Sequence, residues 1–130
     1  MPTRTFLKSK IHRATVTDAN VDYAGSIALC PQLMEAAEIL PFEMVHVNNV
    51  ANGNHWETYV IPGEAGEVTL HGPPAHLFSK GDKIVINCWI QTDAYHFTPR
   101  VVRVDEQNAV TKVDHFHLDG NLFYSQLRKK

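Results

Sequence analysis

The sequence has few cysteines and no surplus of positive charge, and each shortage excludes a class of protein. Cys30 and Cys88 are the only two cysteines in 130 residues. They allow at most one disulfide, which is too few for a disulfide-stabilised scaffold. Twelve Lys and Arg stand against fourteen Asp and Glu, so there is no basic excess to hold a phosphate backbone. Nucleic acid is therefore not an expected partner.

Long apolar runs are also missing. No stretch approaches the roughly 20 apolar residues that a membrane-spanning helix needs, and the first residues lack the apolar segment of a signal peptide. We therefore expect a cytoplasmic protein without membrane contact. With 44% hydrophobic and 20% charged residues the chain suits one globular domain. A length of 130 residues leaves little room for separate cofactor and substrate domains. If the chain is an enzyme, its electrophile must be small or be made in place.

Short runs rich in Val, Ile and Thr, separated by Gly, Pro and Asn, predict a mainly β domain with one clear helix. Pro31 opens the predicted helix, which runs to Ile39 and ends before Pro41. Asn52-Gly53, between two β-type runs, predicts a tight hairpin. The predicted strands are Ile11–Thr17, Ile27–Leu29, Met44–Val50, His55–Ile61, Glu67–His71, Lys83–Ile90, Pro99–Val104 and Ala109–Val113.

Gly25-Ser26 is the first pair of residues that suggests a reaction. A serine hydroxyl can attack the carbonyl before it, and a glycine there places no Cβ beside the attacked carbon and tolerates a strained backbone. Taken alone, the pair is equally well explained as a turn. An ordered set of segments accompanies it, namely Leu7–Arg13, Val16–Ser26, Leu33–Ala37, Asn52-Gly53 and Thr58-Tyr59.

This ordered set resembles the aspartate 1-decarboxylase family, small pyruvoyl-dependent enzymes that make β-alanine. The resemblance runs from Arg4 to about Ile90. It implies one domain over residues 1–130 with the fold of a six-stranded double-psi β-barrel with short helices, assembled as a homotetramer. It also implies a proenzyme that cleaves itself at Gly25–Ser26 into a β chain of residues 1–25 and an α chain of residues 26–130.

The implied processing makes the cofactor from the chain itself. Ser26 Oγ attacks the carbonyl before it, the ester eliminates to dehydroalanine, and hydrolysis leaves a pyruvoyl group and releases ammonia. The ketone of that group condenses with the substrate amine, and the adjacent carbonyl takes up the electrons released as carbon dioxide leaves. The implied enzyme is an amino-acid α-decarboxylase, a carboxy-lyase with L-aspartate as the family substrate, serving pantothenate synthesis or a specialised pathway.

The resemblance also implies roles for single residues. Thr58 would hydrogen-bond the attacked carbonyl and stabilise the oxyanion of the ester step, and Tyr59 would protonate the α-carbon after decarboxylation. Without the resemblance, both are ordinary strand or core residues. Lys10 and His12, two apart on one strand, project to the same face and can present positive charge to a carboxylate. Tyr23 is similar to a family tyrosine that helps to shape the site.

Two segments depart from the family pattern. His55 stands where an arginine ordinarily binds a substrate carboxylate, and a histidine presents one donor at a time instead of a charged bidentate fork. His71, Gly72 and Pro73 stand where the family reads Asn-Gly-Ala, and the proline removes an N–H and stiffens the loop. We therefore expect these four residues to line a remodelled substrate pocket, with aspartate or a different amino acid as substrate.

Two other hypotheses remain open from the sequence. One is an unprocessed, non-catalytic barrel that serves as a binding or structural module, or a proenzyme that awaits a maturation factor. The other is a metal site, because the chain has eight histidines and His115-Phe116-His117 places two imidazoles on one side of a strand. No nearby Cys/His spacing completes a zinc motif, so no metal ligand is predicted.

Overall fold

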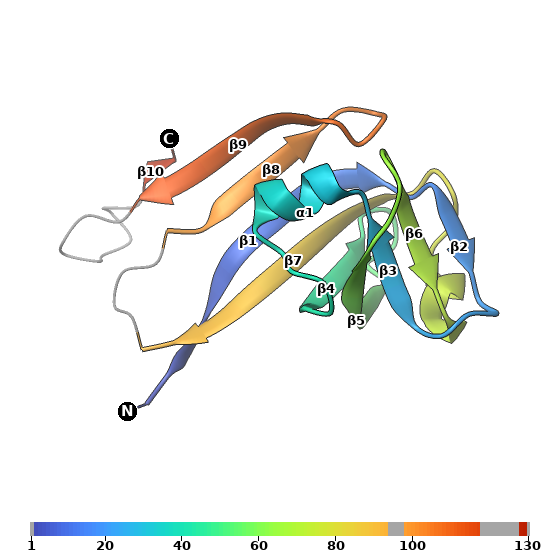
Figure 1. The fold of residues 1–130 in the computed structure, drawn as a ribbon, viewed down its shortest axis with the longest axis horizontal. Helices are drawn as coiled ribbons and strands as arrows, with labels where there is room; N and C mark the ends of the chain where they lie inside the picture. Colours follow the sequence, from blue (N-terminus) through green and yellow to red (C-terminus); the bar gives the residue numbers. More distant parts are fainter. Residues whose placement is uncertain (1, 94–97, 118–127, 130) are drawn as a thin grey trace.

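The computed structural model describes residues 2–93, 98–117 and 128–129, and its architecture is mainly β, as predicted (Figure 1). The strands are β1 (Arg4–Thr15), β2 (Asp18–Asn20), β3 (Ser26–Leu29), β4 (Met44–Asn49), β5 (His55–Pro62), β6 (Val68–His71), β7 (Lys83–Thr92), β8 (Arg100–Val104), β9 (Val110–His117) and β10 (Arg128–Lys129). The described helices are α1 (Pro31–Ala37) and the 3-10 helix η1 (Pro73–Leu77). Neither is long and apolar enough to cross a membrane.

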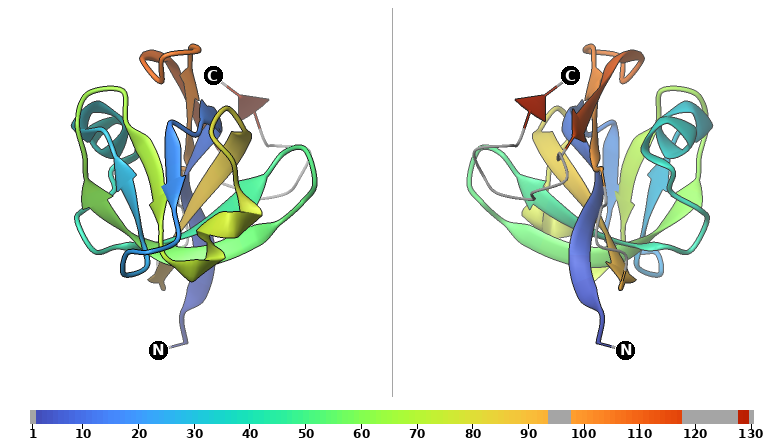
Figure 2. Two further views of the ribbon diagram at one scale, coloured as in Figure 1. Left: turned by 90° about the vertical axis from the view of Figure 1, so that its right-hand side faces the viewer. Right: turned by 90° about the vertical axis from the view of Figure 1, so that its left-hand side faces the viewer.

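The strands hydrogen-bond in the order β10-β9-β8-β1-β7-β4-β5-β3-β6-β2. The pairs β1/β8, β2/β6 and β3/β5 are parallel, and the other pairs are antiparallel. Figure 2 shows these strands curving around one core, with α1 on one side and the β8/β9 hairpin above. Mixed pairing of strands that are distant in sequence agrees with the predicted double-psi β-barrel. The described residues contain ten strand segments instead of six, and β2 and β10 have only three and two residues.

The core is built from strand positions that alternate between the two faces. On β5, Trp56, Thr58 and Val60 are buried, whereas His55, Glu57 and Tyr59 are exposed. The fully buried set includes Ile11, Ile27, Leu29, Leu33, Val45, Val47, Val60, Leu70, Ile84 and Ile86. Burying one such side chain contributes about 1.5–3 kcal/mol relative to leaving it in water. The alternation therefore fixes which face of β5 is available for chemistry outside the core.

Helix α1 begins at the predicted residue and ends two residues before the predicted end. Pro31 occupies the first turn, and Leu33, Met34 and Ala37 face the core. Glu38 adopts a left-handed conformation with φ 56°, and its N–H donates to the carbonyls of the last turn. A residue in that conformation closes a helix, so Ile39 lies outside α1.

The β4/β5 hairpin forms as the Asn-Gly pair predicts. Gly53 has φ 75°, and its N–H donates to the Asn49 carbonyl at 2.8 Å. This short turn sets an antiparallel register in which Asn48 lies opposite His55 and, two residues further on, His46 lies opposite Glu57. The turn thereby determines which polar side chains meet on the outer face of these strands.

Candidate functional site

Ser26 and His71 meet at the point where β3 begins and β6 ends. The antiparallel register places the two residues opposite each other, and Ser26 Oγ lies 3.2 Å from His71 Nδ1. Ser26 is only 4% exposed. The Tyr23 ring packs against the His71 imidazole with a centroid distance of 5.3 Å. The structure thus brings three of the predicted site residues into one cluster, which we call the Ser26 cluster.

The backbone around Gly25 is closely packed on two sides. A Cβ added to Gly72 would lie 2.7 Å from Gly25 Cα, and Gly72 has φ 112°, a conformation that L side chains rarely adopt. The Gly72 N–H donates to the Asn20 carbonyl at 2.8 Å. On another side, a Cβ added to Gly25 would lie 3.7 Å from Trp56 Cζ2. Gly72 is therefore the residue that allows the end of β6 to approach the Gly25–Ser26 peptide bond.

Trp56 is a neighbour of Gly25 that the motifs do not identify. It is 9% exposed and also packs against Phe78, with a centroid distance of 6.4 Å. The sequence signal that could have identified it is the alternation of faces along β5, which predicts that Trp56 and Thr58 share the inner face.

Pro73 follows Gly72 and begins η1. A proline at the start of a helix loses an N–H that would have no partner within the helix, which makes this short helix compatible with the paired prolines. The Pro73 carbonyl accepts a hydrogen bond from His76 Nδ1 at 2.7 Å. The stiff loop expected after Gly72 is thus a short helix, and contact between Pro73 and a substrate remains a prediction.

Thr58 and Tyr59 lie on opposite faces of β5. Thr58 is 9% exposed on the inner face, whereas Tyr59 is exposed and packs against Phe42 with a centroid distance of 5.9 Å. Among the described residues, no hydrogen bond joins the Thr58 hydroxyl to the Gly25 carbonyl. Because neighbouring strand residues point in opposite directions, the two side chains do not face one group within a single chain. Their roles remain predictions.

Lys10 and His12 share one face of β1, as predicted, and alternate with buried residues. Lys10 lies opposite Asn87 of β7 and Val101 of β8, and His12 lies opposite Arg103 of β8. Burial lowers the pKa of His12, and the positive charges of Arg103, Arg13 and Lys10 lower it further. Within the described part of the chain no hydrogen bond, ion pair or ring contact joins Lys10 or His12 to the Ser26 cluster, so the structure does not bring all the predicted residues together.

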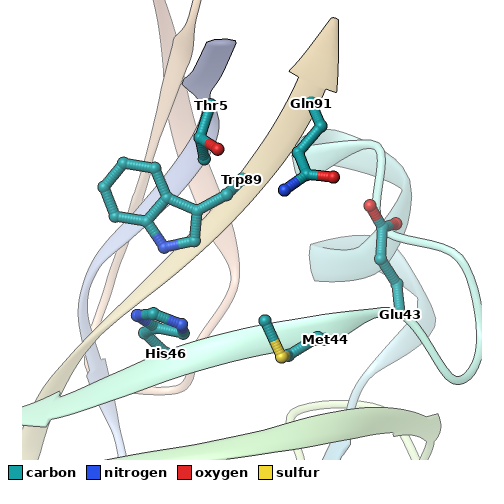
Figure 3. A pocket seen from close by; sticks show the side chains of 6 residues that line it. All are labelled: Thr5, Glu43, Met44, His46, Trp89 and Gln91. Atoms are coloured by element: carbon teal, nitrogen blue, oxygen red, sulfur yellow. The ribbon is translucent and has the colours of Figure 1, made fainter. Parts of the chain in front are cut away.

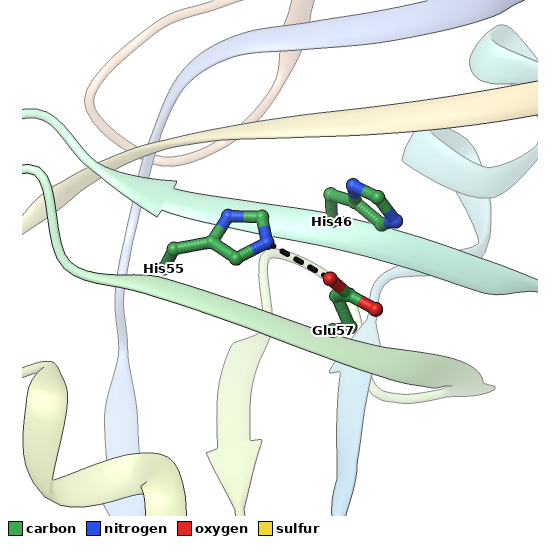
Figure 4. Close-up of side chains that lie close together, drawn as sticks. All are labelled: His46, His55 and Glu57. Carbon is green, nitrogen blue, oxygen red and sulfur yellow. Dashed lines mark hydrogen bonds and ion pairs between the residues drawn. The ribbon is translucent and has the colours of Figure 1, made fainter.

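His55 lies on the outer face of β5 with both ring nitrogens beside oxygen atoms. Its Nδ1 is 2.8 Å from Asn48 Oδ1, and its Nε2 is 3.3 Å from Glu57 Oε2. The His46 ring lies edge-on to the His55 ring at 5.3 Å (Figure 4). A substrate carboxylate approaching His55 would meet the Glu57 carboxylate as well. The expected place of His55 in a remodelled substrate pocket remains a prediction.

A pocket of about 700 Å³ opens beside these residues, on the outer face of β1, β4 and β7 (Figure 3). Its lining residues are Thr5, Glu43, Met44, His46, Trp89 and Gln91. The His46 and Trp89 rings are 5.9 Å apart. The lining comes from three strands that are distant in sequence, which explains why no local motif marks it.

The hypothesis of a metal site at His115 and His117 falls partly outside the described residues. His115 is exposed on β9. The side chain of His117 lies outside the described residues, so the pairing of these two imidazoles remains untested.

Comparison with known proteins identifies relatives over most of the chain. The family model described as aspartate decarboxylase matches residues 2–111. A protein of Dehalococcoides mccartyi named aspartate 1-decarboxylase is 48% identical over 121 residues, which cover 89% of this chain and 98% of the relative. Proteins of the same name from Desulfitobacterium hafniense and Clostridium botulinum are 49% and 46% identical and cover 90% and 92% of this chain, with 96% and 98% of the relatives.

These relatives bear on the hypotheses left open by the sequence. They support a decarboxylase, in agreement with the resemblance on the Gly25-Ser26 and Thr58-Tyr59 motifs. They support neither the expectation of a different amino-acid substrate nor the alternative of a non-catalytic module.

Proposed function

The chain belongs to the aspartate decarboxylase family, and we propose that it catalyses the pyruvoyl-dependent α-decarboxylation of L-aspartate to β-alanine and carbon dioxide. The structural observation that carries this proposal is the contact between Ser26 Oγ and His71 Nδ1 at 3.2 Å, next to the Gly25–Ser26 peptide bond. A buried serine beside a base, with a glycine carbonyl within reach, suits an attack on the backbone.

The pyruvoyl group is proposed to form from Ser26 by self-cleavage. His71 Nδ1 accepts the hydroxyl proton as Ser26 Oγ attacks the Gly25 carbonyl carbon. The new C–O bond replaces the Gly25–Ser26 C–N bond, and the proton passes to the Ser26 amine. Loss of the Ser26 α-proton then expels the Gly25 carboxylate, and hydrolysis of the resulting enamine releases ammonia. The products are residues 1–25 and residues 26–130.

The residues around Ser26 fit such a group. Gly72 leaves room beside Gly25, Trp56 covers another side, and the low exposure of Ser26 limits the access of water. When formed, the group supplies a conjugated carbonyl that takes up the electron pair released with carbon dioxide. Tyr23 packs on His71 and holds the orientation of the imidazole.

The proposed roles of Tyr59, Lys10 and His12 require more than one chain. Tyr59 would protonate the α-carbon, and the two basic side chains would attract the substrate carboxylate, but none of the three touches the Ser26 cluster in the described residues. We therefore propose a homotetramer in which neighbouring subunits bring them together. Exposed large apolar side chains support assembly. They include Leu40, Phe42, Met44, Tyr59 and Trp89.

Intact mass spectrometry and an assay of β-alanine test the proposal. We expect the purified chain to give two fragments divided at Gly25–Ser26 and to release carbon dioxide from L-aspartate. Ser26→Ala gives one species of 14.7 kDa without activity, and Ser79→Ala, at an exposed serine, behaves as wild type. Turnover by the uncleaved chain contradicts the mechanism, and turnover of another amino acid in place of aspartate contradicts the substrate. If the purified chain divides only after another protein is added, that protein is a maturation factor.

A further inference from the structure

Three side chains that can ligate a metal gather on the outer face of β4 and β5. In the antiparallel register His46 lies opposite Glu57, and Asn48 lies opposite His55. These neighbouring cross-strand pairs place four polar side chains side by side. One ligand atom each from His46, His55 and Glu57 lies within 4.8 Å of the other two, and Figure 4 shows the three side chains converging.

We propose that His46, His55 and Glu57 bind one divalent transition-metal ion of the zinc class. Two imidazole nitrogens and one carboxylate oxygen are ligands that Zn²⁺ takes at about 2.0–2.2 Å, which places neighbouring ligand atoms of a tetrahedral site about 3.4 Å apart. His55 and Glu57 are exposed and His46 is half-buried, so small side-chain rotations bring the atoms to that spacing. Mg²⁺ and Ca²⁺ prefer oxygen ligands and do not suit this set.

Asn48 prepares His55 for this role. The His55 Nδ1–H donates to Asn48 Oδ1 at 2.8 Å in the tautomer that leaves a lone pair on Nε2. That Nε2 lies 3.3 Å from Glu57 Oε2, a contact that either a proton on Nε2 or a metal ion between the two atoms can satisfy. A metal-bound histidine ordinarily donates its other ring N–H to an oxygen, which fixes the ring orientation. The contact with Asn48 supplies this arrangement before a metal binds.

Three protein ligands leave one coordination position of the ion open. His46 also lines the pocket that contains Trp89, so the open position lies beside that pocket. Water or an anionic oxygen ligand, such as a carboxylate, completes the coordination. Within one chain no hydrogen bond, ion pair or ring contact of the described residues joins this site to the Ser26 cluster, and the site goes beyond the proposed decarboxylation because it does not depend on cleavage of the chain.

Calorimetric titration of the metal-free full-length protein with ZnCl₂ tests the site. We expect one Zn²⁺ per chain with a Kd of about 1 µM or lower. His46→Gln and Glu57→Gln each weaken binding by about 100-fold or more. Asn48→Ala weakens it by about 10-fold, as loss of an outer contact does. Ser26→Ala binds Zn²⁺ as wild type, which separates this site from the proposed processing.

His115→Gln is the matched control, because His115 is an exposed strand histidine outside the cluster. Circular dichroism establishes that each variant is folded, and Co²⁺ in place of Zn²⁺ gives the visible absorption of a tetrahedral site in wild type but not in His46→Gln. Zn²⁺ binding that survives His46→Gln and Glu57→Gln overturns the proposal. A wild-type Kd above about 100 µM, or an equal loss in His115→Gln, also overturns it.

Discussion

Ser26 Oγ and His71 Nδ1 are 3.2 Å apart across the β3/β6 pair, and this is the polar side-chain contact of Ser26 among the described residues. The imidazole is thus placed to accept the hydroxyl proton when Ser26 attacks the preceding carbonyl. The family pattern has an asparagine at the position of His71, and an amide can hydrogen-bond but cannot serve as a base.

We predict that His71→Ala slows self-cleavage by about 10²-fold or more, because general-base assistance contributes about 10²–10⁴-fold to such steps. The rate is followed as the intact mass divides into two fragments. His76→Ala is the control, since His76 is exposed on η1 and, within the described part of the chain, its side chain bonds only to the Pro73 carbonyl. Cleavage of His71→Ala at the wild-type rate would show that the imidazole takes no part in the proton transfer.

Gly72→Ala is predicted to destabilise the fold by about 2–4 kcal/mol, the sum of a strained backbone and an overpacked contact. The added Cβ would meet the backbone of Gly25 at 2.7 Å, in a residue with φ 112°. Gly53→Ala is the matched control. Gly53 also has a positive φ, of 75°, but open space surrounds its missing Cβ, so only the backbone cost of about 1–2 kcal/mol is expected. Urea unfolding compares the two, and equal losses would contradict the packing argument.

The strands around the Asn52-Gly53 turn are among the parts of the fold that local sequence predicts well. The expected runs Met44–Val50 and His55–Ile61 match β4 and β5 to within one residue at each end. The five residues 50–54 connect these strands, and a connection this short brings them together without information from distant parts of the chain. By contrast, β1 begins at Arg4, seven residues before the expected start, because it pairs with β7 up to Thr92. Pairing between distant segments leaves no local pattern.

The candidate sites also differ in how much of each can be predicted from the sequence. The resemblance identifies Gly25 and Ser26, and the structure adds their contacts with Gly72 and His71. Of the proposed metal ligands, His55 and Glu57 lie nine and eleven residues after His46, and the three form no linear zinc motif. They become neighbours only through the β4/β5 register. A two-residue Asn52-Gly53 turn would pair His46 with Tyr59, so the observed pairing of His46 with Glu57 is known only from the structure.

Glu43→Gln is predicted to lower the free energy of unfolding at pH 7 by about 1–3 kcal/mol, the cost of losing hydrogen bonds to a charged group. Burial raises the pKa of the Glu43 carboxyl, but hydrogen bonds from Lys8, the Leu40 N–H and Cys88 outweigh it and hold the pKa below 4.5. The folded chain therefore binds fewer protons than the unfolded chain. The stabilisation is present above pH 4.5 and is lost as the pH falls through the lowered value.

Urea unfolding at a series of pH values checks this prediction for Glu43. Wild type loses stability below pH 4.5 more steeply than Glu43→Gln, because the variant has no carboxyl to protonate at that position. Glu64→Gln, at an exposed carboxylate, is expected to change the free energy of unfolding by less than about 0.5 kcal/mol. Parallel pH profiles for wild type and Glu43→Gln would contradict the assignment.

Arg13→Asn is predicted to raise the pKa of His12 toward 6.5. Burial lowers the pKa of His12 first, and the charges of Arg103, Arg13 and Lys10 add to that effect, so one removed charge reverses only part of the shift. Asn suits the position because Arg13 has φ 62°, which asparagine tolerates better than most residues. Protonated His12 is disfavoured more in the folded chain than in the unfolded chain, so it costs stability as the pH falls below 6.5. An NMR titration of the His12 ring protons measures the shift, with the signal assigned by its loss in His12→Gln. An unchanged midpoint in Arg13→Asn would mean that the charge of Arg13 does not contribute to the lowered pKa of His12.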